Sequence, residues 1–121
     1  MSRPVSSATA EHYTWGANCD GWHLVKDEKL SVIAEQMPPG AAEVLHFHER
    51  AQQFFFVLSG EAVMDVDGQQ VRLTAHNGMY VRPGVGHQIR NVSTEPVRFL
   101  VISQPPSHGD RVVVEEWNVH Q

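Results

Sequence analysis

The chain has 121 residues, a length that suits one domain with a single hydrophobic core. Its 14 acidic residues against 9 Lys and Arg give a net charge of -5, which argues against non-specific nucleic-acid binding. No apolar run approaches the ~20 residues of a membrane helix, and the N-terminal segment lacks the apolar core of a signal peptide. The single cysteine, Cys19, excludes an internal disulfide framework, so we expect a cytoplasmic protein that does not insert into a membrane.

The N-terminal part of the chain falls into two stretches. Residues 1–12 are small and polar, and we expect them to form a flexible arm or an exchanged N-terminal strand, followed by one β-barrel domain over residues 13–121. Residues 13–21 mix aromatic residues with turn formers. We expect Trp15 and Trp22 to cover one end of the core, with the lining of a ligand site as the alternative.

Short apolar runs separated by turn residues fill the rest of the chain. Hairpin and turn signals stand at Asp67-Gly68 and Asn77-Gly78, and no stretch has helical periodicity. About nine strands with turns roughly ten residues apart predict an antiparallel sandwich or barrel. The predicted strands are 22–25, 30–37, 44–48, 53–58, 61–66, 69–73, 79–81, 87–92 and 97–103, with 111–116 as a further edge strand.

Two histidines one residue apart are the most informative feature of the sequence. On a strand, residues i and i+2 project from the same face, so His46 and His48 would lie side by side. Gln53 opens the next predicted strand, and His87 opens another after a Pro-Gly turn. In an antiparallel barrel these four side chains can converge at one mouth, which predicts a metal site. The alternative is that the histidines are ordinary polar residues at a barrel rim.

These residues resemble the first sequence motif of the cupins. That motif is a Gly, five residues, His-x-His, three or four residues, Glu, six residues and a Gly. The chain has Gly40, AAEVL, His46-Phe47-His48, ERAQ, Gln53, FFFVLS and Gly60. Every spacing fits, and only the Glu is changed, to Gln53.

The second cupin motif is matched in part. It ends in Pro-x-Gly-x-x-His-x-x-x-Asn, and the chain supplies Gly84, His87 and Asn91 at those positions. Arg82 stands where the motif has its Pro. The motif also begins with a Gly further upstream, and the chain has His76 at that position. The resemblance implies an all-β fold, the cupin double-stranded β-helix or jelly-roll barrel.

The resemblance also implies roles for individual residues. His46, His48 and His87 would be metal ligands, Gln53 would occupy the place of the fourth protein ligand, and Asn91 would be structural. The expected cofactor is one divalent transition metal ion, and imidazole ligands suit Fe, Mn, Ni, Zn and Cu alike. Members of the family of this size commonly form homodimers, often with an exchanged N-terminal strand, so we expect a homodimer.

Gln53 makes the predicted site unusual. An amide oxygen is a neutral and weaker ligand than a carboxylate, so three imidazoles and a Gln leave the full +2 charge on the ion. Such a site should retain metal less tightly and favour an anionic ligand, and these residues do not form a two-His-one-carboxylate triad. The alternative is that Gln53 orients a water or a histidine instead of binding the metal.

Strand alternation predicts the pocket lining. The residues expected to share a face with the ligands are Val44, Phe55, Val57, Met64 and Ile89, with either Met37 or Glu35 as a neighbour. The other five histidines, His12, His23, His76, His108 and His120, are expected at the surface, His76 being the one most able to approach the site. No Ser, Cys or acid has a spacing that marks it as a nucleophile or general base.

The leading hypothesis for function is a metal-dependent enzyme that acts on a small, anionic organic molecule, with oxygenase or isomerase chemistry favoured. The alternative is a non-catalytic module that binds or senses a small molecule. A third reading is a structural unit with a vestigial site. The fold does not distinguish between these three hypotheses, because proteins that share it have many different functions.

Overall fold

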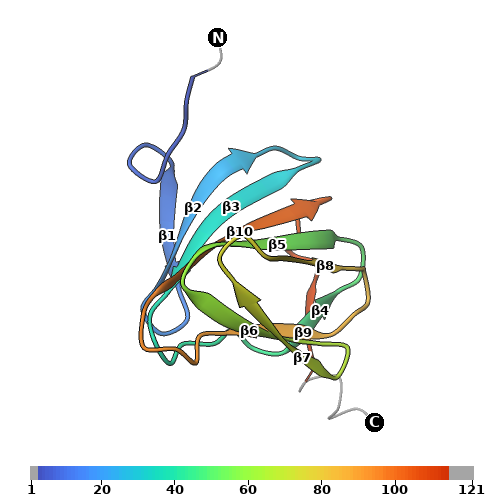
Figure 1. The fold of residues 1–121 in the computed structure, drawn as a ribbon. Coiled ribbons are helices and arrows are strands. Elements are labelled where there is room, and N and C mark those ends of the chain that lie inside the picture. Colours follow the sequence, from blue (N-terminus) through green and yellow to red (C-terminus); the bar gives the residue numbers. More distant parts are fainter. Residues whose placement is uncertain (1–2, 115–121) are drawn as a thin grey trace.

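The computed structural model describes residues 3–114, and its eleven secondary-structure elements are all β-strands (Figure 1). In chain order they are β1 (Glu11–Trp15), β2 (Cys19–Lys26), β3 (Ser31–Met37), β4 (His46–His48), β5 (Gln52–Ser59), β6 (Glu61–Val66), β7 (Gln69–Thr74), β8 (Gly78–Val81), β9 (His87–Arg90), β10 (Val97–Gln104) and β11 (Arg111–Val113). None of the described residues belongs to a helix long and apolar enough to cross a membrane.

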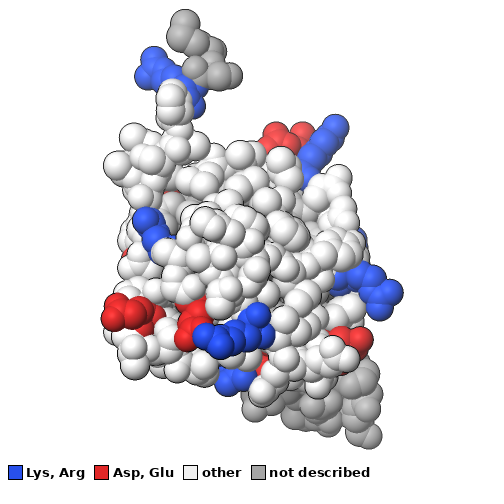
Figure 2. All heavy atoms as spheres, viewed as in Figure 1, with Lys and Arg blue, Asp and Glu red and all other residues white. Residues whose placement is uncertain are grey.

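The strands form two antiparallel sheets that enclose a barrel. The six-stranded sheet has the order β1-β2-β3-β10-β5-β8, and the five-stranded sheet has the order β11-β4-β9-β6-β7. The predicted all-β jelly-roll barrel is therefore confirmed. Figure 2 shows the molecule in the same view as Figure 1. Acidic and basic side chains are scattered over the visible face, with mostly uncharged surface between them.

The turn at Asp67-Gly68 forms the hairpin that the sequence predicts. Asp67 and Gly68 have φ angles of 50° and 78°, and β6 and β7 pair from Val66 and Gln69 outwards. Two consecutive residues with positive φ match the twist of the flanking strands, which is why Asp-Gly is favoured here.

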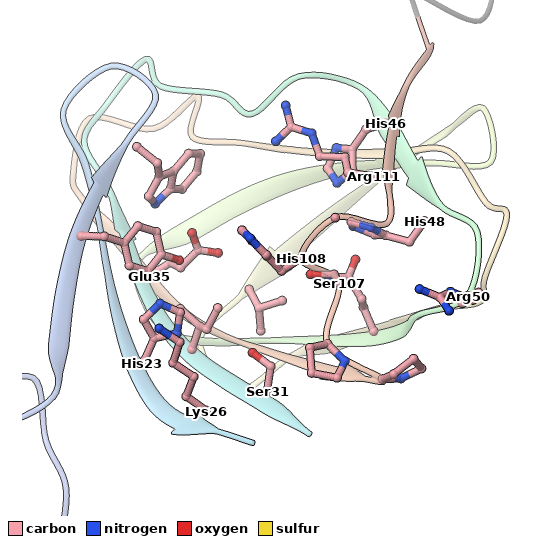
Figure 3. Close-up of a pocket in the computed structure, with 18 of the residues that line it drawn as sticks. His23, Lys26, Ser31, Glu35, His46, His48, Arg50, Ser107, His108 and Arg111 are labelled. Atoms are coloured by element: carbon pink, nitrogen blue, oxygen red, sulfur yellow. The ribbon is translucent and has the colours of Figure 1, made fainter. Parts of the chain in front are cut away.

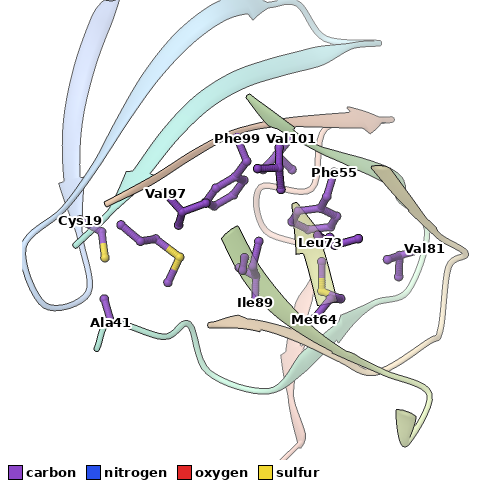
Figure 4. Close-up of a cluster of buried hydrophobic side chains, with 13 residues drawn as sticks. Cys19, Ala41, Phe55, Met64, Leu73, Val81, Ile89, Val97, Phe99 and Val101 are labelled. Carbon is purple, nitrogen blue, oxygen red and sulfur yellow. The ribbon is translucent and has the colours of Figure 1, made fainter. Parts of the chain in front are cut away.

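The hydrophobic core lies between the two sheets (Figure 4). The inward residues of β10, Val97, Phe99 and Val101, alternate with half-buried outward ones, as expected of a strand with one face on the core. Phe99 is fully buried, as are Met64 and Ile89 from the opposite sheet. Burying a side chain of this size contributes roughly 1.5–3 kcal/mol.

The N-terminal region is where the structure differs most from the predicted strands. β1 begins at Glu11, inside the predicted arm, and pairs with β2 in the same chain. β2 also starts earlier than predicted, at Cys19. β1 has a weak sequence signal because it is a short edge strand whose residues are at most half-buried. Exchange of this strand between subunits stays a prediction.

Two other strand predictions also change. β4 covers only His46–His48, because the chain before it leaves the sheet and exposes Val44 and Leu45. The last strand, β11, is described as Arg111–Val113, and the predicted residues 115–116 lie outside the described part of the chain.

Candidate metal centre

Three buried histidines from two neighbouring strands of the five-stranded sheet meet inside the barrel. His46 and His48 both point inward from β4, and His46 pairs in register with His87 at the start of β9. Each offers a ring nitrogen, and the three nitrogens lie within 4.8 Å of one another. One metal ion could therefore be held by all three, as the spacing of the sequence motifs predicts.

Hydrogen bonds fix the orientation of two of the rings. His46 Nδ1 lies 2.7 Å from the carbonyl oxygen of Val44, and His87 Nδ1 lies 3.0 Å from that of Val85. A carbonyl can only accept, so both Nδ1 atoms carry the proton and both Nε2 atoms keep a free lone pair. This backbone support is typical of metal-binding histidines.

Some polar atoms at the centre are buried without a protein partner. They include His87 Nε2 and His48 Nδ1. A buried polar atom that lacks a partner costs about 1–3 kcal/mol, and a bound metal ion would satisfy a lone pair of this kind. The donor set thus fits a transition metal ion.

Burial keeps these histidines neutral. Loss of hydration, with a smaller contribution from the neighbouring His87, lowers the pKa of His46 to about 3 and that of His48 to about 4. Burial also lowers the pKa of His87. At neutral pH all three imidazoles are unprotonated, which is the form that binds a metal.

Gln53 is buried on β5, in the opposite sheet. Its Nε2 donates a hydrogen bond to Ser103 Oγ at 3.0 Å, while its Oε1 is buried with no partner. An amide oxygen left free in this way suits either a metal ligand or a group that holds a water. Gln52 faces the other side, as predicted: it is exposed, and its Oε1 accepts a hydrogen bond from Tyr80.

A buried acid from a distant part of the chain fixes the loop between β4 and β5. The Asp110 carboxylate accepts hydrogen bonds from the backbone N–H groups of Arg50, at 3.0 Å, and Ala51, at 2.8 Å. Although desolvation raises the pKa of Asp110, these hydrogen bonds outweigh it, and the pKa is lowered. Asp110 thereby positions the loop that joins His48 to Gln53. Sequence reasoning missed it because no local motif contains it.

A cavity of about 1030 Å³ opens beside the histidines (Figure 3). Its lining combines the candidate ligands His46, His48 and Gln53 with apolar and charged side chains. The other lining residues are Tyr13, Trp15, His23, Lys26, Asp27, Glu28, Ser31, Ile33, Glu35, Glu43, Arg50, Phe55, Val101, Pro105, Pro106, Ser107, His108, Gly109 and Arg111.

The structure places the residues of the predicted pocket lining at different depths. Phe55 lines the cavity, whereas Val57, Met64 and Ile89 belong to the hydrophobic core. These three face the interior as predicted but lie deeper in the barrel. Val44 is 45% exposed and lies outside the pocket, because the chain has not yet joined β4 at that residue.

Several polar residues of the pocket were not predicted. His23 and His108, expected at the surface, line the cavity, while His76 lies exposed against Phe56. Glu35, one of two alternatives in the sequence, faces the cavity, and its neighbour on the same face, Met37, packs in the core.

Glu43 and Arg111 also line the cavity, and no motif in the sequence indicates either. Arg111 pairs in register with His48, and its charge lowers the pKa values of His46 and His48. A fixed cation therefore lies beside the candidate metal centre.

Replacing Gln53 with Glu should tighten metal binding if the residue is a ligand, because a carboxylate neutralises part of the metal charge. We expect at least about a ten-fold gain in affinity, measured by competition with a chromophoric chelator. Gln52→Glu, which adds the same charge on the exposed side, serves as the control. Equal affinities of the wild-type and Gln53→Glu proteins would place Gln53 outside the coordination sphere.

Comparisons with known proteins agree with this geometry. A family model described as a cupin domain matches residues 34–103. The oxalate-binding protein of Thermotoga maritima is 30% identical over 66% of this chain and 70% of its own length. Oxalate decarboxylase of Bacillus subtilis is 32% identical over 94% of this chain, which spans only 30% of that longer protein.

A solved structure supports the fold alone. The polyketide cyclase from Streptomyces resistomycificus superimposes with a TM-score of 0.80 over 94% of this chain and 86% of its own, at 15% identity. The family match covers more than half of the sequence and includes His46, His48, Gln53 and His87. The chain therefore belongs to the cupin domain family.

Proposed function

We propose that this protein is a metal-dependent cupin that binds and transforms a small carboxylate anion. The observation that carries the proposal is the cluster of three neutral, buried histidines, whose ring nitrogens lie within 4.8 Å of one another. His46, His48 and His87 would hold one divalent transition metal ion, with Gln53 as the fourth protein ligand.

The charge balance of the pocket supports an anionic ligand. Because all four candidate ligands are neutral, the metal would keep its full +2 charge. Arg111 adds a cation close to His46 and His48, and Arg50 and Lys26 line the same cavity. The two relatives named for oxalate, a binding protein and a decarboxylase, support a carboxylate as the ligand class.

The residues of this chain would have separate roles at the site. A bound metal supplies Lewis acidity, which polarises a carboxylate or carbonyl group. Arg111 orients the anion, and the apolar wall that includes Phe55 excludes water. The reaction classes that we propose are of the oxygenase or isomerase type.

A binding module without catalysis is the second candidate. The relative in Thermotoga maritima is named for binding oxalate. The same metal centre and cationic pocket would serve a protein that senses or stores a carboxylate.

A panel of small carboxylates tests the proposal. We expect the metal-loaded protein to bind at least one of them at least about ten times more tightly than the chelator-treated protein, as measured by calorimetry. Product analysis and oxygen uptake by the iron-loaded protein then separate the candidates: turnover supports an enzyme, and binding without turnover supports the module. Metal-loaded protein that binds no carboxylate would contradict both.

We also propose that the protein is a cytoplasmic homodimer. The outward face of β5 and β8 carries Phe54, Leu58 and Tyr80, all substantially exposed. An apolar surface of this kind favours association, and a second copy of the chain is the partner that we propose.

A further inference from the structure

The cavity contains a cluster of acidic groups that the metal centre does not use. Glu35 on β3, Glu43 in the loop before β4 and Tyr13 on β1 all line the cavity. Burial, with a smaller contribution from the charge of Glu43, raises the pKa of Glu35 to about 8. Burial likewise raises the pKa of Glu43 to about 8, against a hydrogen bond from the Ile89 N–H and the charge of Arg111. At neutral pH the cluster therefore consists mostly of neutral hydrogen-bond donors.

The sheet places this cluster through one cross-strand row. Tyr13, Gly21, Glu35 and Phe99 are register partners on β1, β2, β3 and β10. Gly21 has no side chain, and an added Cβ would overlap the Tyr13 ring. The phenol can therefore lie across β2 toward β3. Burial, and after it the charges of Glu35 and Glu43, raise the pKa of Tyr13, and all three groups line the same cavity.

Register also separates Glu35 from Gln53, one of the candidate metal ligands. Gln53 lies in the row of Ser103 and Ser31, whereas Glu35 lies in the row of Phe99 and Val57. Four residues along a strand separate the two rows, roughly 13 Å at about 3.3 Å per residue.

The row between them is mostly apolar. Ile33, Val101 and Phe55 are register partners there, and all three line the cavity. His23, the register partner of Ile33 on β2, also lines the cavity. The cavity thus has a cationic metal end, a mostly apolar middle with His23 at one side, and a donor end. Its volume of about 1030 Å³ is also far larger than a two-carbon dicarboxylate needs.

We propose that the pocket takes an acid with a ring-sized apolar body and a hydrogen-bond acceptor at its far end, and that Glu35 donates a hydrogen bond to that acceptor. This inference rests on the proposed function, because the metal would hold the carboxylate of the same molecule. Oxalate would occupy only the metal end.

A matched pair of ligands isolates the Glu35 contact. 4-Acetylbenzoate has a carboxylate, a ring and a carbonyl acceptor, and 4-isopropylbenzoate has the same number of heavy atoms in a similar branched substituent without the acceptor. We expect metal-loaded wild-type protein to prefer the acetyl compound about three- to ten-fold at pH 7, the effect of one net hydrogen bond. A change in metal binding alters the affinities for both benzoates by the same factor. The ratio of the two affinities therefore reports only on the contact with Glu35.

The preference should depend on pH. Above pH 8 Glu35 loses its proton, and the ratio should fall toward one by pH 9.5. The titratable groups that line the cavity or influence the cluster on the side of Glu35 are Tyr13 from β1, Cys19 and His23 from β2 and Glu43 from the loop before β4. Arg111 from β11 acts on Glu43. Glu35→Gln keeps a donor that cannot ionise, so its preference should persist at pH 9.5.

Two further variants complete the experiment. Glu35→Leu should lose the preference at every pH, and Glu28→Gln, which removes an exposed acid lining the cavity, should behave as wild type. A ratio of one in wild-type protein, or a pH dependence unchanged in Glu35→Gln, would overturn the inference. If neither benzoate nor oxalate binds the metal-loaded protein, the proposed function fails instead. Thermal melting checks that each variant is folded.

Discussion

Replacing His48 with alanine is expected to abolish stable metal binding. Loss of a residue that only supports a ligand typically costs 10–100-fold in affinity, so loss of a ligand should cost more than about 100-fold. His48 is buried beside two other neutral imidazoles, and the substitution leaves only His46 and His87 with Gln53. Metal analysis of protein purified without chelators should show about one ion per wild-type chain and far less in the variant.

A surface histidine provides the control for this experiment. His76 is exposed and has a φ of 69°, which Asn tolerates better than most residues, so His76→Asn removes an imidazole with little backbone strain. Its metal content should equal that of wild type. Wild-type stoichiometry far below one, unchanged by His48→Ala, would be incompatible with a metal centre at these residues.

Replacing Asp110 with alanine is expected to cost about 3 kcal/mol of folding free energy, because it leaves buried backbone donors of the β4–β5 loop without their charged acceptor. The N–H groups of Arg50 and Ala51 lose hydrogen bonds of 3.0 and 2.8 Å. For a domain of this size the melting temperature should fall by roughly 10 °C. Because the loop joins two candidate ligands, metal affinity should fall as well.

The pH dependence of this contribution follows from the sign of the pKa shift. The folded-state pKa of Asp110 is lowered, so its contribution is fully present above the ordinary Asp pKa of about 3.9 and is lost as pH falls through the folded-state value. The stability difference between wild type and Asp110→Ala should therefore shrink below about pH 4.

Arg50→Ala separates the hydrogen bonds from the ion pair. The Arg50 side chain is 79% exposed and lies 3.9 Å from Asp110, so the pair itself should contribute less than about 1 kcal/mol. Equal, small losses in the Arg50 and Asp110 variants, measured by denaturant unfolding, would refute a structural role for the buried carboxylate.

Local patterns predicted most of the strands and, within them, the face that most side chains take. Alternation placed His46 and His48 together, and turn residues placed Gln53 and His87 at the starts of other strands. The histidine cluster was therefore predictable from spacing and the motif resemblance. The depth of a side chain in the barrel was not predictable. Val57 and Ile89 face inward as predicted, but they pack in the core. Alternation along a strand indicates the face that a side chain takes and not its distance from the barrel mouth.

The missed residues share a different cause. Asp110 meets Ala51 across 59 positions, and Glu35 and Glu43 line one cavity from a strand of one sheet and from the loop before β4 of the other. Such contacts depend on how the sheets stack, which no short window of sequence contains. The bounds of β1 were not predicted for a local reason: a short edge strand carries little hydrophobic pattern of its own.

The four candidate ligands do not all come from the same sheet. The histidines stand on β4 and β9 of the five-stranded sheet, and Gln53 stands on β5 of the six-stranded sheet. An ion bound by the proposed set would therefore act as a cross-link between the two layers of the barrel. The strength of the bond between Gln53 and the metal would then determine how much metal binding adds to the free energy of unfolding.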